Sequence, residues 1–131
     1  MLVVDDATEV RQVFAEFLSR AGMHVTQADG ARAAIVAARG ARPDLVVTDI
    51  VMPEVDGLEL CRQIRAHPAT SHVPIVIVSG DLSEEGAAAW EAGCDAVLAK
   101  PCSRVLLVAT VRRLLGTGVL DTPERRPGRV R

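Results

Sequence analysis

Short apolar runs alternate with longer amphipathic stretches along the first 115 residues of the chain. The apolar runs are rich in valine, isoleucine and leucine, as expected for strands that are buried on both faces of a sheet. The pattern predicts strands over residues 1–4, 24–28, 44–48, 73–78 and 96–99. Pro74 stands near the start of the fourth strand, where a missing backbone N–H is tolerated.

The amphipathic stretches between the apolar runs predict five helices. Over residues 7–20, apolar side chains recur with helical spacing on one face. The other helices are predicted over residues 31–39, 58–66, 83–92 and 104–115. Residues suited to end or to begin a helix stand at several boundaries, namely Gly22, Gly40, the His67-Pro68 pair, Ser83 and Ser103. Glu84 and Glu85 fall in the first turn of the fourth helix, where negative charge suits the helix dipole.

Strands that alternate with helices in this way predict an α/β fold built from βαβ units. Its sheet should be parallel and covered by helices on both faces. In such folds a ligand site lies beyond the carboxyl ends of the strands. Polar residues fall at these ends, namely Asp5, Asp6, Asp49, Ser79 and Lys100. We therefore expect these side chains to meet in one site when the chain folds.

Lys100 is the only lysine among the 15 lysines and arginines of the chain. An ammonium group is a compact point charge that a forked guanidinium cannot replace, so this exception points to a specific role. The carboxylates at neighbouring strand ends would repel one another and disfavour the folded protein unless a cation relieved the repulsion. A cluster formed by Asp5, Asp6 and Asp49 offers the hard oxygen ligands that suit Mg²⁺.

Composition narrows the class of protein. The 131 residues fit one domain, and 49% hydrophobic with 24% charged residues is ordinary for a soluble globular protein. No apolar run approaches the roughly 20 residues of a membrane span, and no signal peptide is apparent. A net charge of −2 gives no sign of nucleic-acid binding. The three cysteines suggest neither a disulfide framework nor a zinc site, so we expect a cytoplasmic protein with reduced thiols.

The end of the chain differs from the rest. Residues 116–131 contain prolines, glycines and several arginines, without apolar periodicity. This composition favours a flexible basic tail or the remnant of a linker, and the segment is too short to be a second domain. We therefore expect one domain over residues 1–115, followed by this tail.

Four motifs carry a resemblance to a known family. They are Val3-Val4-Asp5-Asp6, Asp49 to Pro53 with Asp56-Gly57, Val78-Ser79-Gly80, and Lys100-Pro101. In this order and at this spacing they resemble the receiver domain of two-component response regulators, of the chemotaxis-regulator type. The resemblance covers residues 1–115. It implies a flavodoxin-like doubly wound (βα)5 fold, with a five-stranded parallel sheet in the order 2-1-3-4-5.

The resemblance also implies a role for each residue of the site. Asp49 would be the phosphoacceptor and form an acyl phosphate. Asp5, Asp6, Asp49 and the backbone carbonyl of Val51 would hold Mg²⁺ or Mn²⁺. Lys100 and the Ser79 hydroxyl would each bind a phosphoryl oxygen, in keeping with the positioning and charge neutralisation that phosphoryl transfer needs. The peptide bond before Pro101 would be cis.

The expected function is that of a phosphoacceptor signalling switch rather than of an enzyme with an external substrate. The resemblance implies that a sensor histidine kinase or a histidine phosphotransfer protein donates the phosphoryl group. An output partner would be bound by the face of helix 83–92, strand 96–99 and helix 104–115, and neither nucleic acid nor a membrane is an expected partner of this domain. Asp81, two residues after Ser79, and Val51 would flank the path of the hydrolytic water.

Two positions depart from the family pattern. Val97 stands where the family usually has an aromatic ring that moves with the switch, and Cys102 stands where a large apolar residue often follows Lys-Pro. Trp90, the only tryptophan, is expected to pack in the core next to this region.

Three other interpretations share parts of the pattern. A degenerate receiver that serves only as a docking or dimerisation module would be expected to have lost one of the acidic residues or the lysine. A dehalogenase-type phosphatase needs a second acid two residues after its nucleophile, where this chain has Val51. A flavodoxin-type flavin binder needs a phosphate loop after the first strand, where this chain has Asp5-Asp6.

Overall fold

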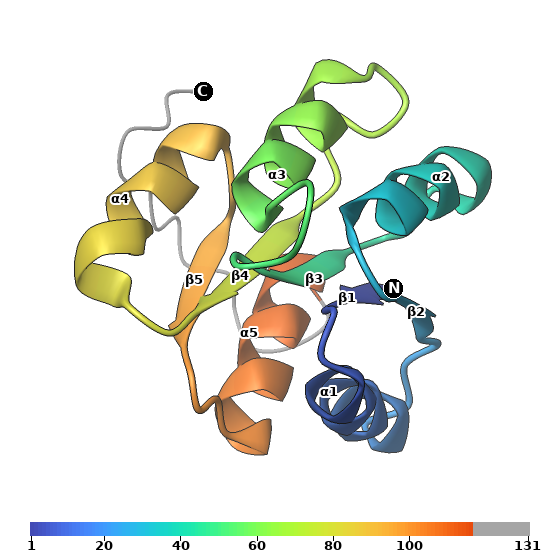
Figure 1. Cartoon of the computed structure of the whole chain (residues 1–131). Coiled ribbons are helices and arrows are strands. Elements are labelled where there is room, and N and C mark those ends of the chain that lie inside the picture. The colour runs from blue at the N-terminus through green and yellow to red at the C-terminus, as the bar shows by residue number, and fades with distance from the viewer. Residues whose placement is uncertain (117–131) are drawn as a thin grey trace.

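Strands and helices alternate from residue 2 to residue 115 in a computed structural model that describes residues 1–116 (Figure 1). The strands are β1 (Leu2–Val4), β2 (Thr26–Ala28), β3 (Val46–Asp49), β4 (Ile75–Ser79) and β5 (Ala96–Ala99). The helices are α1 (Thr8–Arg20), α2 (Ala31–Ala41), α3 (Gly57–Ala66), α4 (Leu82–Ala92) and α5 (Arg104–Leu115). Except for Gly116, the expected tail at 116–131 lies outside the described residues.

The five strands form one parallel sheet in the order β2-β1-β3-β4-β5. This confirms the predicted flavodoxin-like fold, including the strand order that the resemblance implied. The register pairs Asp49 with Val78 and Ser79 with Ala99. The carboxyl ends of β3, β4 and β5 therefore lie side by side, and the loops that follow them share one edge of the sheet.

Helices cover both faces of the sheet (Figure 1), and an apolar layer of buried side chains lies on each face. Successive strand residues point to opposite faces, so Leu2 and Val4 contact one layer and Val3 the other. One layer contains buried residues of α2, α3 and α4, and the other contains those of α1 and α5. No helix within residues 1–116 combines the length and hydrophobicity that a bilayer span requires.

Four helix boundaries differ from the sequence prediction: α1 begins one residue later, α3 and α4 begin one residue earlier, and α2 ends two residues later. α4 begins at Leu82, because the Asp81 carboxylate accepts hydrogen bonds from the backbone N–H groups of Ser83 and Glu84 and so caps the helix. The predicted cap, Ser83, lies inside the first turn. α2 continues through Gly40 and ends at Ala41, and the capping residue Arg42 adopts a left-handed conformation with φ 45°. Pro43 follows directly and disfavours a helical conformation at Arg42, so the proline ends this helix where the glycine does not.

The boundaries of β1 to β4 shift by one to two residues, because pairing with the neighbouring strand decides them, whereas β5 has the predicted bounds. β3 and β4 start later than the hydrophobic runs suggested and end one residue later, at Asp49 and Ser79. Pro74 consequently precedes β4, where its carbonyl oxygen accepts a hydrogen bond of 2.9 Å from the Val46 N–H. The other predicted caps agree with the structure, since the Ser103 hydroxyl accepts from the Leu106 N–H at the start of α5 and Gly22 has φ 92° just after α1.

One partly buried cation, Arg65, joins three segments at the amino ends of β4 and β5. The Arg65 guanidinium of α3 lies 2.6 Å from the Asp95 carboxylate and donates to the carbonyls of Ser71, Val73 and Gly93. The same carboxylate accepts a hydrogen bond of 2.7 Å from the Ile75 N–H. A single side chain thus fixes the end of α4 and the entry to β4 relative to α3.

Candidate functional site

Three carboxylates meet at the carboxyl edge of the sheet. Asp5 and Asp6 follow β1, Asp49 ends the neighbouring strand β3, and one oxygen of each lies within 4.8 Å of the others. Asp5 is buried at 1% exposure, whereas Asp6 is exposed. Backbone N–H groups orient the two less exposed carboxylates: Ala7 donates to Asp5 and Ile50 to Asp49, each at 2.9 Å. The cluster that the sequence predicted is therefore formed.

Lys100 reaches this cluster from the end of β5. Its Nζ lies 3.2 Å from Asp49 Oδ1 and 3.5 Å from Asp5 Oδ2. The following peptide bond, to Pro101, is cis, as the resemblance implied. The backbone N–H of Lys100 donates to the Ser79 carbonyl at 2.8 Å, which ties the β5–α5 loop to the end of β4.

The surroundings of the Asp49 carboxyl disfavour its ionised form. Burial raises its pKa above the ordinary value of 3.8, and the charge of Asp5 adds to this effect. The hydrogen bond and charge of Lys100 and the Ile50 N–H act in the opposite direction without cancelling it. The Lys100 ammonium group thus does not offset the cost of burying the Asp49 charge, and a further cation at this edge would be stabilised.

Ser79 lies at the end of β4 and is fully buried. Its hydroxyl donates a hydrogen bond to the Glu85 carboxylate of α4 and accepts one of 3.0 Å from the Asp81 N–H. The sequence analysis assigned Glu85 only to the helix dipole and missed this contact. The sequence does show an acid, Glu85, six residues after the strand-end hydroxyl of Ser79 and in the first turn of the next helix. The direction in which the Glu85 side chain points, however, depends on where that helix begins.

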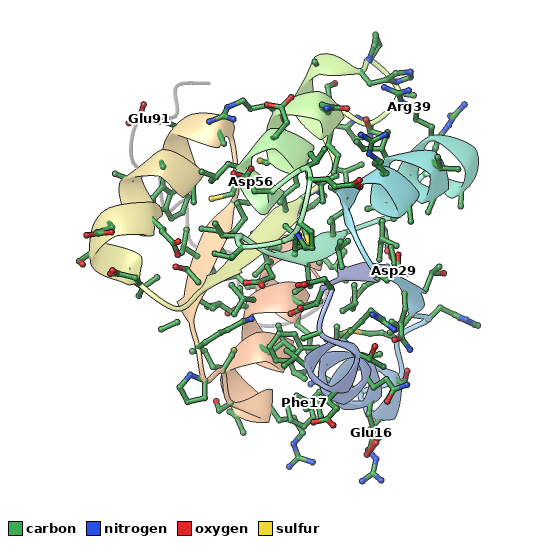
Figure 2. The ribbon with its side chains drawn as sticks, in the orientation of Figure 1. Glu16, Phe17, Asp29, Arg39, Asp56 and Glu91 are labelled. Carbon is green, nitrogen blue, oxygen red and sulfur yellow. The ribbon has the colours of Figure 1, made fainter. Side chains whose placement is uncertain are left out.

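Gly57 brings the start of α3 against the backbone of Asp49. A Cβ at position 57 would lie 2.0 Å from the Asp49 carbonyl oxygen. The Gly57 N–H donates to the Ile50 carbonyl at 2.8 Å, and the Asp56 carboxylate caps the helix through the Glu59 N–H. Figure 2 shows Asp56 on the loop that leads into α3. This close approach fixes the backbone on which Asp49 stands, and accounts for the Asp-Gly pair noted in the sequence.

Four further positions were noted in the sequence, namely Val51, Trp90, Val97 and Cys102. The Val51 side chain is 67% exposed on the loop after β3. Val97 and Trp90 are half-buried and pack against the layer that contains α2, α3 and α4, so the tryptophan packs on the core as expected. Cys102 is half-buried against the opposite layer, and burial raises the pKa of its thiol.

Residues 1–112 match the family described as the response regulator receiver domain. The chain belongs to this family. The receiver is 40% identical over 116 residues to the response regulator MprA of Mycolicibacterium vanbaalenii, an alignment that covers 88% of this chain and 49% of that protein. The chain therefore spans about half the length of the curated relatives it matches.

Solved structures agree with this receiver fold. A putative response regulator from Chloroflexus aurantiacus superposes with a TM-score of 0.83 at 34% identity, over 88% of this chain and 95% of that one. The receiver domain of the sensor histidine kinase PA1611 from Pseudomonas aeruginosa also gives 0.83, at 28% identity and with the same two coverages. That structure has a magnesium ion coordinated in its active-site cleft.

Proposed function

We propose that this receiver is a phosphorylation-dependent switch whose phosphoacceptor is Asp49. The observation that carries the proposal is the position of Lys100 Nζ, 3.2 Å from Asp49 Oδ1, beside two further carboxylates at the same edge. The ammonium group would neutralise charge on a phosphoryl oxygen, and the strand ends would hold the nucleophile and the cation in fixed geometry. The site thereby supplies positioning and charge compensation, the two main requirements of phosphoryl transfer.

The donor is proposed to be a phosphohistidine on a sensor kinase or on a histidine phosphotransfer protein. An Asp49 carboxylate oxygen attacks phosphorus, the P–N bond to the imidazole breaks, and the imidazole nitrogen keeps the electron pair and takes up a proton. Asp49 then carries an acyl phosphate, which water later hydrolyses. The protein modifies only itself in this cycle, as a regulatory domain in the cytoplasm rather than as an enzyme with an external substrate.

The residues present fit a divalent cation. Oxygen atoms of Asp5, Asp6 and Asp49 lie within 4.8 Å of one another, and carboxylates are the ligands that Mg²⁺ prefers. These three side chains and the backbone carbonyl of Val51 would hold Mg²⁺, or Mn²⁺ in its place. When bound, the cation would neutralise charge on the carboxylates and on a phosphoryl oxygen. The magnesium ion in the PA1611 receiver supports this assignment.

Ser79 is proposed to bind a third phosphoryl oxygen through its hydroxyl. This contact would draw the β4–α4 loop toward Asp49 and bias the arrangement of α4, β5 and α5, the face proposed for an output partner. Val97 cannot act as an aromatic switch residue, so the Ser79 loop and α4 would transmit most of the change. The proposed domain comprises residues 1–115.

Labelling of Asp49 tests the proposal. With acetyl phosphate and Mg²⁺, intact mass spectrometry should detect one phosphoryl group on the wild-type protein and none on Asp49→Asn. Replacing Mg²⁺ with EDTA, which removes divalent cations, should also abolish labelling. The matched control is Asp29→Asn, an exposed carboxylate just after β2 at the same edge of the sheet (Figure 2), which should label like the wild type.

Persistent labelling of Asp49→Asn at the wild-type rate would contradict the assignment of the phosphoacceptor. A wild-type protein that takes up no phosphoryl group from acetyl phosphate or from a phosphorylated kinase would instead favour the docking or dimerisation module. These two results separate an error in the residue from an error in the function.

A further inference from the structure

In the unphosphorylated chain the Ser79 hydroxyl already donates one hydrogen bond and accepts another. A serine hydroxyl has a single proton to donate. Ser79 donates that proton to the Glu85 carboxylate, while its oxygen accepts the Asp81 N–H at 3.0 Å. Since the side chain is fully buried, solvent offers no alternative partner. The hydroxyl therefore cannot donate to another oxygen without leaving Glu85.

We infer that Glu85 restrains the switch by holding the hydroxyl proton of Ser79 until a phosphoryl oxygen displaces it. The inference rests on the proposed phosphorylation of Asp49 and adds a positioning residue to that site. A hydrogen bond to an ionised carboxylate is stronger than one between neutral groups. Contacts made in the activated conformation must therefore offset the loss of this hydrogen bond. Glu85 thus shifts the equilibrium of the unphosphorylated protein toward the inactive conformation.

The charges at this edge reinforce the exchange. A phosphoryl group on Asp49 would add negative charge where Asp5 and Asp6 already stand, and like charges repel. When the Ser79 hydroxyl turns to the phosphoryl oxygen, the Glu85 carboxylate loses this donor while the edge of the sheet becomes more negative. Glu85 belongs to the first turn of α4. Its release therefore frees the start of that helix and links the chemistry at Asp49 to a secondary-structure element.

Neighbouring residues supply matched controls. Glu84 precedes Glu85 in the same first turn, carries the same charge and is exposed, so its substitution reproduces the change in net charge without touching Ser79. Glu85→Ala removes the acceptor. Glu85→Gln keeps the shape and leaves a neutral acceptor, which should give an intermediate result. Ser79→Ala removes the donor and should make position 85 irrelevant.

The first experiment measures binding of beryllofluoride with Mg²⁺, a phosphoryl mimic, by titration calorimetry. Glu85→Ala should tighten the dissociation constant by about tenfold, the amount expected when a competing charge-assisted hydrogen bond is removed. Glu84→Ala should change it by less than about twofold, as expected for an exposed charge. In the Ser79→Ala background, Glu85→Ala should behave like Glu84→Ala. Equal tightening by both glutamate variants, or an undiminished effect without Ser79, would overturn the inference.

The second experiment uses the protein without mimic, in EDTA, and separates this inference from the proposed function. Thermal unfolding of Ser79→Ala, Glu85→Ala and the double variant should be non-additive, because either single substitution already breaks the shared hydrogen bond. Additive shifts in melting temperature would overturn the role of Glu85 even if the mimic binds. A wild-type protein that binds no beryllofluoride would overturn the proposed function, and the restraint with it, whatever the outcome of the thermal cycle.

Discussion

The Asp49 carboxyl is held between two opposing influences. Burial and the neighbouring Asp5 disfavour its ionised form, whereas the Lys100 ammonium group favours it, and the net result is a raised pKa. Because the folded protein holds the proton more tightly than the unfolded chain does, ionisation of Asp49 costs stability. This cost is absent below the ordinary value of 3.8 and develops as the pH rises through the raised pKa of the folded state.

Replacing this carboxylate should therefore have a pH-dependent effect on the protein without metal. Asp49→Asn should gain stability relative to the wild type as the pH rises from about 4 toward 7, since the amide carries no charge that is costly to bury. Urea unfolding in EDTA across this range measures the difference in the free energy of unfolding. A difference that is constant with pH, or that moves toward the wild type as the pH rises, would contradict the raised pKa.

The carboxylates and Lys100 could be located from the sequence because fold logic places the carboxyl ends of parallel strands at one edge. A position directly after a short apolar run was enough to predict where each of these side chains lies. The contact between Ser79 and Glu85 could not be located in this way. It depends on the rotation of α4 relative to β4, which Asp81 sets by capping the helix in place of the predicted Ser83.

The start of α3 is packed too closely on β3 to accept a side chain. At Gly57 an added Cβ would lie 2.0 Å from the Asp49 carbonyl oxygen and 3.0 Å from Ile50 Cα, both backbone atoms. Gly57→Ala should therefore destabilise the fold by about 1–3 kcal/mol, as overpacking typically does, and should also slow labelling of Asp49. Chemical denaturation and intact mass spectrometry measure the two effects.

Gly86 provides the control for this substitution. It lies inside α4, and an added Cβ would meet nothing within 4 Å. Gly86→Ala should stabilise the protein by about 0.5–1 kcal/mol, because alanine loses less conformational freedom in a helix. If both glycine variants changed stability in the same direction, the contact with Asp49 would not be the cause of the effect at position 57.

The number, kind and order of the helices and strands followed from hydrophobic periodicity with the resemblance, but their exact ends did not. Strand ends depend on the hydrogen bonds of the neighbouring strand, as the shift of β4 past Pro74 illustrates. Helix ends depend on capping groups that compete, and Pro43 ended α2 where Gly40 had been expected to do so. The local sequence is compatible with several end points for each helix or strand, and contacts with the rest of the fold decide which one is used.

At the scale of the whole molecule, the Arg65–Asp95 pair is a contact whose loss should lower stability strongly. The pair is largely buried, at 15% and 6% exposure, with N and O atoms 2.6 Å apart. Arg65→Met would leave the Asp95 charge buried without this partner and should cost about 3–5 kcal/mol. Arg62→Met, which breaks an exposed pair with Glu59 on the same helix, should cost less than about 1 kcal/mol. Similar losses in urea unfolding of the two variants would contradict this ranking.

The same arginine determines how α4 can move. The helix is tied to α3 at its last residues, through Arg65 to the Gly93 carbonyl and through the Cys61 thiol to the Ala92 carbonyl. Its other end reaches the proposed phosphorylation site through Glu85. Figure 2 shows Glu91 at the tied end, far from the β4–α4 loop. If the Ser79 hydroxyl leaves Glu85 as proposed, α4 would pivot about its last residues, near Gly93. The displacement would increase along the helix toward the exposed Leu82. The first turn of α4 would therefore move furthest and would be the part of the surface that changes most for a binding partner.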